Sequence, residues 1–147
     1  MTNTLDLWLI GALLAQGAIA LVLLWVLGAV RIPLVMNHKV QIKDVALSRE
    51  AWPEQEKRVS NAFDNQFQLP VLFYVAGAVS LHFGTIWIEV LLAWLFVATR
   101  LVHAAVFATT NNVAHRFSAY TAGYALLGLF WLELIVRLVF MLVWNRT

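Results

Sequence analysis

Three groups of polar and aromatic side chains recur at helical spacing in a chain that is otherwise strongly apolar. Members of each group are three or four residues apart, so they share one face of a helix. The groups are Arg58, Asn61, Asn65 and Gln68; Arg100, His103 and Phe107; and Arg116 with Tyr120. Polar side chains at membrane depth are costly and face the protein interior. We therefore expect the three groups to meet in one polar pocket.

Such a pocket can hold a ligand, but the chain supplies no thiol of its own. It contains no cysteine, which excludes disulfides, thiolate metal sites and cysteine nucleophiles. Any thiol chemistry must use a thiol that a ligand brings. No pair of histidines has metal-ligand spacing, so no metal site is predicted. The net charge of +2, without a basic run, argues against nucleic acid as a partner.

Composition places these residues in a membrane protein. Of 147 residues, 62% are hydrophobic and 12% are charged, and the mean hydropathy is +0.78. An ordinary soluble domain is about 45–50% apolar and about 25% charged. A soluble protein of this size could not bury so much apolar surface, so the excess must face lipid. The length allows one unit, and we predict a single membrane domain over residues 1–147.

Four apolar runs are long enough to cross the bilayer as helices, since about 20 residues span its hydrocarbon core of roughly 30 Å. Continuous apolar runs favour helices over the alternating strands of a barrel. The predicted spans cover about residues 7–30, 67–83, 86–108 and 117–144, with a polar loop over about 31–65. Arg31 and Pro33 end the first span, and Gly84-Thr85 forms the turn between the second and third. The predicted fold is an all-α membrane protein with a four-helix bundle.

Basic residues are distributed unevenly around these spans. Eight of the ten Lys and Arg residues lie on the side of the long loop, and only Arg137 and Arg146 lie on the other. The positive-inside rule then predicts a cytoplasmic loop and both termini outside. Near the outer end, Glu133 and Arg137 are four residues apart, with the acid first, which favours an ion pair within the helix. Glu89 is interpreted as an interfacial residue.

Two motifs resemble those of the MAPEG family (membrane-associated proteins in eicosanoid and glutathione metabolism). The segment from Arg58 to Pro70 is similar to the family's stretch ending Asn-x-x-Glu before a proline, with Asn65 at the asparagine. Residues 100–120 read Arg-x-x-His-x-x-x-Phe, then eight intervening residues, then Arg-x-x-x-Tyr. This second motif matches, without a gap, the family's glutathione-using enzymes. The resemblance covers nearly the whole chain, which looks like a divergent bacterial-type member.

The resemblance implies a homotrimer of four-helix subunits in a bacterial inner membrane, with glutathione bound between neighbouring subunits near the cytoplasmic face. It implies that glutathione is held by Arg31, Asn65, Gln68, Arg100, His103 and Tyr120. Arg116 is implied to be the catalytic residue, because an adjacent guanidinium lowers the pKa of a thiol. The thiolate would conjugate a lipophilic electrophile, or reduce a lipid hydroperoxide, that arrives through the bilayer.

Three positions depart from the family pattern. Gln68 replaces a glutamate that holds the amino group of the tripeptide, Asp64 replaces an arginine found in some members, and Phe107 replaces a tyrosine. An alternative function is therefore a non-catalytic trimeric membrane scaffold or lipid-binding protein with the same fold. A third possible function is a small multidrug exporter. Such an exporter requires an acidic residue in the middle of the first span, where this chain has Gln16. It also has short loops, whereas the first loop here has roughly 35 residues.

Overall fold

The structure is a computed structural model that describes residues 3–144, and long helices make up most of it. In chain order the elements are α1 (Thr4–Met36), α2 (Ile42–Val45), α3 (Glu54–Asp64), the 3₁₀ turn η1 (Asn65–Phe67), α4 (Leu69–Phe83), α5 (Trp87–Ala108) and α6 (Val113–Trp144). Within residues 3–144 there is no strand. Four helical segments are long and apolar enough to cross a membrane, with α3, η1 and α4 together forming the second. The predicted all-α fold with four spans is confirmed.

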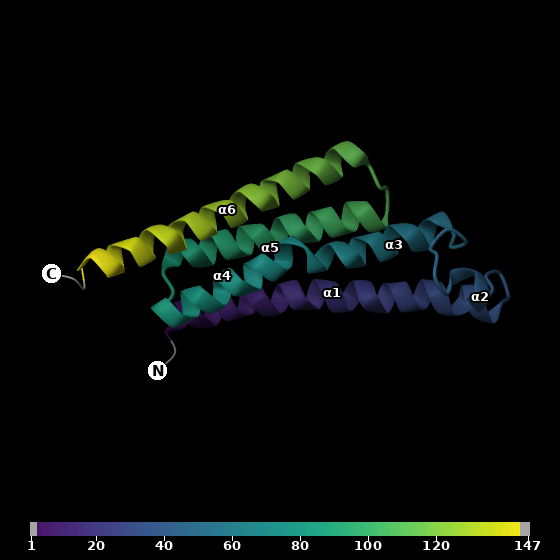
Figure 1. The fold of residues 1–147 in the computed structure, drawn as a ribbon, viewed down its shortest axis with the longest axis horizontal. Helices are drawn as coiled ribbons and strands as arrows, with labels where there is room; N and C mark the ends of the chain where they lie inside the picture. Colours follow the sequence, from purple (N-terminus) through teal and green to yellow (C-terminus); the bar gives the residue numbers. More distant parts are fainter. Residues whose placement is uncertain (1–2, 145–147) are drawn as a thin grey trace.

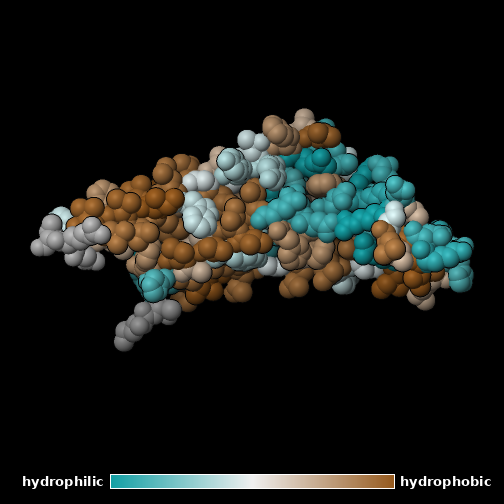
Figure 2. Space-filling view, in the orientation of Figure 1, coloured by the Kyte–Doolittle hydropathy of each residue, from teal (hydrophilic) through white to brown (hydrophobic). Residues whose placement is uncertain are grey.

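Both described chain ends lie at one end of the bundle, and α2 lies at the other (Figure 1). Hydrophilic residues gather at the α2–α3 end, whereas hydrophobic residues cover most of the opposite half (Figure 2). Many large apolar side chains are exposed there and along the helices, among them Leu14, Leu21 and Trp25. Such an exposed apolar surface is expected of a protein whose solvent is lipid. Arg146, counted in the charge asymmetry, lies outside the described residues.

The boundaries of the first loop differ from those predicted. α1 continues through Pro33 to Met36, because a proline near the end of a helix removes only one main-chain hydrogen bond. Residues 54–64, within the stretch predicted as a polar loop, form α3, which agrees with the helical spacing of Arg58 and Asn61. The helix buries one face that includes Glu56 and Val59. The connection predicted over 31–65 therefore narrows to residues 37–53, which include α2. At the last span, α6 begins at Val113, four residues earlier than predicted.

The apolar core joins α4, α5 and α6 through three aromatic rings. Phe73 of α4 stacks on Phe96 of α5 with a centroid distance of 4.6 Å. It also meets Phe130 of α6 edge-on at 6.5 Å. All three are buried, and α1 adds Leu9 and Ala12 to the same cluster. This cluster fixes the relative positions of the helices that carry the polar groups.

Two glycines shape the packing of α5. Gly84 has φ +85°, which favours glycine, and it makes the predicted turn between α4 and α5. Gly123 lies where α6 crosses α5, and a Cβ there would be 2.7 Å from Thr99 Oγ1 and 3.8 Å from Arg100 Cδ. The missing side chain lets α6 approach α5 next to Arg100.

A pair of glutamine side chains is buried between α1 and η1. Gln16 Nε2 donates to Gln66 Oε1 at 2.9 Å, and Gln66 Nε2 donates to the carbonyl of Ala62 at 3.1 Å. Gln16 is fully buried, and Gln66 is 3% exposed. An amide pair in a membrane span joins helices by hydrogen bonding where the hydrophobic effect cannot.

Replacing Gln16 with Leu should destabilise the protein, because Gln66 Oε1 would lose its donor inside the bundle. We expect a coupling free energy of about 0.6 kcal/mol, and at most about 1.7 kcal/mol, between Gln16→Leu and Gln66→Leu. The measurement is a double-mutant cycle on unfolding in mixed micelles. Strictly additive single and double variants would show that the bond contributes nothing.

Candidate functional site

A pocket lies at the α2–α3 end of the bundle, where η1, α5 and α6 meet. Its volume is about 210 Å³. It is lined by Asn65, His103, Phe107, Val113, Arg116, Phe117 and Tyr120. We call these residues the polar pocket. The three sequence groups thus each contribute to it: Asn65 from the first, His103 and Phe107 from the second, and Arg116 and Tyr120 from the third.

The break between α3 and α4 positions Asn65. Pro70 lacks an N–H and disfavours helix before it, and the chain passes through the 3₁₀ turn η1 before α4 begins. Arg100 Nη2 donates to the backbone oxygen of Asn65 at 3.2 Å and forms a second hydrogen bond with Asn65 Oδ1. The Asn65 amide nitrogen in turn donates to Gln68 Oε1 at 3.1 Å. Arg100 therefore holds the helix break and orients the asparagine.

Arg100 and His103 are deeply buried, yet both keep polar atoms without a partner. Arg100 is 0% exposed and His103 is 2% exposed. Nε and Nη1 of Arg100 and Nδ1 of His103 form no hydrogen bond within the described part of the chain. The Arg100 guanidinium carbon lies 5.9 Å from the centre of the Tyr120 ring. Buried polar groups are nearly always satisfied, so these atoms are available to donate to, or accept from, a ligand or water.

Arg116 lies at the start of α6 with its guanidinium over Phe107. The guanidinium carbon is 4.1 Å from the centre of that ring. Its Nη1 donates to Asn111 Oδ1 at 2.6 Å, which ties the side chain to the short α5–α6 connection. The charge is thus held at the pocket wall by one aromatic face and one neutral amide. Asn111 was not predicted, because its position follows from a left-handed residue in the connection (φ +51°).

The arginines of residues 3–144 divide into two classes. Those of the first class each form an ion pair with a carboxylate; the pairs are Arg31–Glu56, Arg49–Asp64, Arg58–Glu54 and Arg137–Glu89. Arg100 and Arg116 form none within the described residues. Both uncompensated guanidinium groups are at the polar pocket, one in its wall and one directly behind Asn65 and Tyr120. The pocket is therefore a positively charged site that suits an anionic ligand.

Four predicted residues are not brought into the pocket: Arg31, Arg58, Asn61 and Gln68. Asn61 is on the exposed face of α3. Arg31 contacts Glu56 at 2.6 Å and lies over the Trp52 ring, on the α1–α3 side of the bundle. Arg58 pairs with Glu54 and donates to the carbonyl of Thr109 at 2.9 Å, so it joins α3 to the end of α5. Gln68 is exposed and reaches the site only through Asn65.

Asp64, the acidic residue that departs from the family pattern, is also directed away from the polar pocket. Asp64 forms an ion pair with Arg49, in the segment between α2 and α3, and this hydrogen bond raises the pKa of Arg49. No carboxylate lines the polar pocket. Apolar Val113 and Phe117, which sequence spacing did not select, complete the lining because α6 starts earlier than predicted. An anion entering here would meet two cations and no acid.

Comparison with known proteins identifies the family of the chain. The chain matches the MAPEG family model over residues 9–142, which is more than half of the sequence and includes every residue of the polar pocket. No curated protein and no solved structure matches the chain. With four helices able to span a membrane, this chain is an integral multi-pass membrane protein, and it belongs to the MAPEG family.

Proposed function

We propose that the protein is a membrane-bound glutathione transferase or peroxidase that activates a thiolate in the polar pocket. The observation that carries this proposal is the pair of uncompensated arginines, Arg100 and Arg116. A site with two cations and no acid favours an anionic ligand, and arginine stays charged even when it is partly desolvated. Family membership supports glutathione as the thiol that the chain itself lacks.

In this mechanism each residue of the pocket has a separate task. Arg116 lies beside the sulfur, lowers the pKa of the thiol and stabilises the thiolate. Asn65, oriented by Arg100, holds the ligand backbone through its amide, and the imidazole of His103 and the hydroxyl of Tyr120 give further hydrogen bonds. The thiolate then forms a C–S bond to an apolar electrophile while the leaving group departs as an anion.

The residues fit part of glutathione better than the rest. Its thiol and carboxylates suit the two guanidinium groups, whereas its ammonium meets no carboxylate in the pocket. We propose that the functional unit is a homotrimer in which the ligand lies between neighbouring subunits. Arg31, which the resemblance implies as a ligand contact, would then act on the pocket of an adjacent subunit. Gln68 would accept from the ammonium in place of the family's glutamate.

The alternative is a non-catalytic trimer that keeps the fold as a scaffold or lipid-binding protein. The ion pair of Asp64 with Arg49 and the neutral Gln68 favour it, since neither residue supplies a charge to the ligand. Turnover separates the two functions: purified protein is mixed with glutathione and a lipophilic aryl chloride, and chloride release is followed. We expect conjugation that depends on glutathione and protein, and binding without conjugation would favour the scaffold.

We also propose that both termini are outside and that the α2–α3 end is cytoplasmic. The chain has no cysteine, so Asn3→Cys and Ser48→Cys each carry a single exposed thiol. An impermeant maleimide should label them from opposite sides of sealed vesicles, because the basic residues favour the cytoplasm. Thr110→Cys is a matched control that should label from the same side as Ser48→Cys. Labelling of Asn3→Cys and Ser48→Cys from one side would contradict the proposed topology.

A further inference from the structure

A second cavity lies at the opposite end of the bundle from the polar pocket, between α5 and α6. Its volume is about 570 Å³. We call it the α5–α6 groove. Its lining is apolar, with Leu92, Leu129 and Phe140 among its side chains, apart from Glu133 and Arg137. Ionisable residues at membrane depth are rare and mark functional sites.

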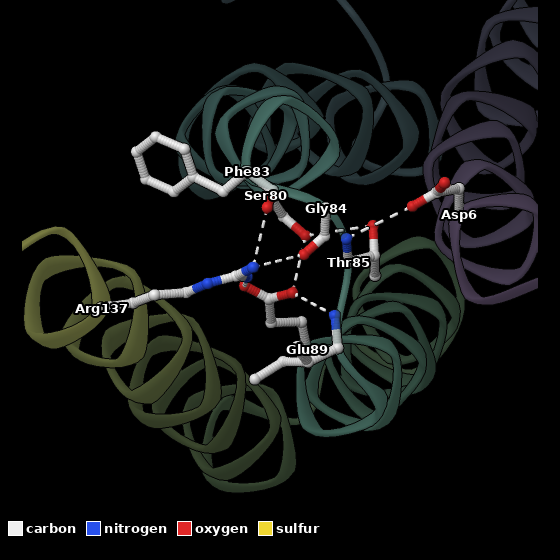
Figure 3. Close-up of polar contacts among 8 residues, drawn as sticks. Asp6, Ser80, Phe83, Gly84, Thr85, Glu89 and Arg137 are labelled. Atoms are coloured by element: carbon white, nitrogen blue, oxygen red, sulfur yellow. Dashed lines mark hydrogen bonds and ion pairs between the residues drawn. The ribbon is translucent and has the colours of Figure 1, made fainter. Parts of the chain in front are cut away.

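Arg137 is not paired with Glu133, although their spacing predicts it. Its Nη1 lies 3.3 Å from Glu89 Oε1, and its Nη2 donates to the carbonyls of Phe83 and Gly84 at 2.8 and 2.6 Å. Figure 3 shows the guanidinium between these groups, where α4 ends and α5 begins. The helix end of α4 offers free carbonyl groups that a cation satisfies. This is why tertiary contacts outcompete the i,i+4 pair.

Glu89 is the acid that neutralises Arg137. It is fully buried, instead of interfacial as predicted, and its Oε2 accepts from Ser80 Oγ at 2.9 Å and from the Ile86 N–H at 2.7 Å. Together with the bond from Arg137, these contacts satisfy both oxygens (Figure 3). The pair is a complete structural unit that joins α4, α5 and α6.

Glu133 is not part of the Arg137–Glu89 pair. Its carboxyl group is close enough to the Glu89 carboxyl and the Arg137 guanidinium for their charges to act on it, but no donor in residues 3–144 bonds its buried Oε2. Glu133 in the groove lining and the buried Glu89 behind it thus make two carboxyl groups near one guanidinium, that of Arg137. The other charged or titratable groups nearby are engaged or exposed: Asp6 of α1 accepts from the Thr85 N–H, and His82 of α4 is exposed. One negative charge in an apolar lining remains to be neutralised by a proton or a cation.

We propose that the α5–α6 groove binds a lipophilic amine, whose ammonium pairs with the Glu133 carboxylate and whose alkyl body packs on Leu129, Leu132 and Phe140. Charge complementarity selects this occupant, because an apolar groove with one spare carboxylate disfavours an alkyl carboxylate and gives an alkyl alcohol no ion pair. The site is separate from the polar pocket, which is cationic and lies at the other end of the bundle. It does not depend on glutathione chemistry.

Photolabelling of the full-length protein in phosphatidylcholine nanodiscs tests this proposal. The probe is a dodecylammonium carrying a diazirine on its chain, and matched probes carry an alcohol or a carboxylate in place of the ammonium. We expect the ammonium probe to label peptides within residues 86–92 and 129–140 about tenfold more than either matched probe. Unlabelled dodecylammonium should compete. Equal labelling by ammonium and alcohol would overturn the proposal, because the groove would then be an ordinary apolar surface.

Two variants and two bilayer compositions test whether the labelling depends on Glu133 and on the lipid. Glu133→Gln should lower ammonium labelling about tenfold, whereas the control Glu50→Gln, in the exposed segment between α2 and α3, should not change it. If Glu133→Gln does not fold, the comparison of the three probes on the wild type still decides. Labelling that phosphatidylethanolamine in the nanodisc abolishes would overturn the proposal in favour of a phospholipid. A cross-link that joins a residue of the groove to a neighbouring subunit would overturn the proposal, because a second copy of the chain would then occupy the groove.

Discussion

Replacing Arg116 with Leu should lower glutathione turnover with a lipophilic aryl chloride by about ten- to a hundredfold. This corresponds to about 1.4–2.7 kcal/mol of lost thiolate and transition-state stabilisation. The guanidinium is held over Phe107 and by Asn111, and no carboxylate among residues 3–144 pairs with it, so its charge is available to a bound sulfur. Without it the pKa of the bound thiol returns toward about 8.5, and the rate profile should shift to higher pH.

Two further variants distinguish this role from a structural one. Arg116→Lys keeps the charge but not the planar stacking on Phe107, so its turnover should fall between those of the wild type and Arg116→Leu. Arg49→Leu removes an arginine outside the polar pocket and should leave turnover unchanged. Native mass spectrometry should show the same trimer for all. Turnover of Arg116→Leu equal to that of the wild type would remove Arg116 from the mechanism.

Replacing Arg100 with Met should abolish ligand binding without unfolding the protein. Arg100 is a fully buried cation without a carboxylate partner in the described residues, so its replacement removes a desolvation cost along with two bonds to Asn65. These effects oppose each other, and replacing buried charges by apolar residues of similar volume is often neutral or stabilising. We expect the melting temperature without ligand to change by no more than about 5 °C. Stabilisation by glutathione should disappear.

The measurement is a thermal unfolding series in mild detergent, with and without glutathione. Arg58→Met is the control: it lies on α3, it is paired with Glu54, and it is expected to keep the stabilisation by ligand. A collapse of the trimer in Arg100→Met before any ligand is added would mean that the side chain holds the fold and not the site. If glutathione stabilises Arg100→Met as much as the wild type, the charge of Arg100 does not contribute to ligand binding.

The features that sequence predicted best are those set by local chemistry. Apolar runs gave the four spans, since a helix must satisfy its own backbone in lipid. The turn at Gly84 follows from its conformational freedom. The three groups at helical spacing predicted which faces carry Asn65, His103 and Tyr120, and the structure brings these side chains to one pocket. That they bind glutathione stays a prediction.

The features that sequence did not predict depend on which helices become neighbours. Spacing paired Arg137 with Glu133, but the end of α4 and Glu89 offer it more bonds. Gln16 and Gln66 lie 50 residues apart, and no local pattern marks them as a pair. The spacing of the first group of polar residues, from Arg58 to Gln68, predicts one helix face. The 3₁₀ turn η1 interrupts that helix, so that Gln66 turns inward and Gln68 outward. Nearby charges, not helical period, likewise decide that Arg31 binds Glu56.

The most direct test of the account is the ultraviolet difference absorbance of glutathione thiolate on the purified wild-type protein at neutral pH. The account predicts a thiolate band that saturates as glutathione rises to millimolar concentration and that disappears in Arg116→Leu. Free glutathione is mostly protonated at this pH, so the band reports a thiol whose pKa the protein has lowered. Its absence from the wild type at millimolar glutathione, together with no turnover, would contradict thiolate activation in the polar pocket.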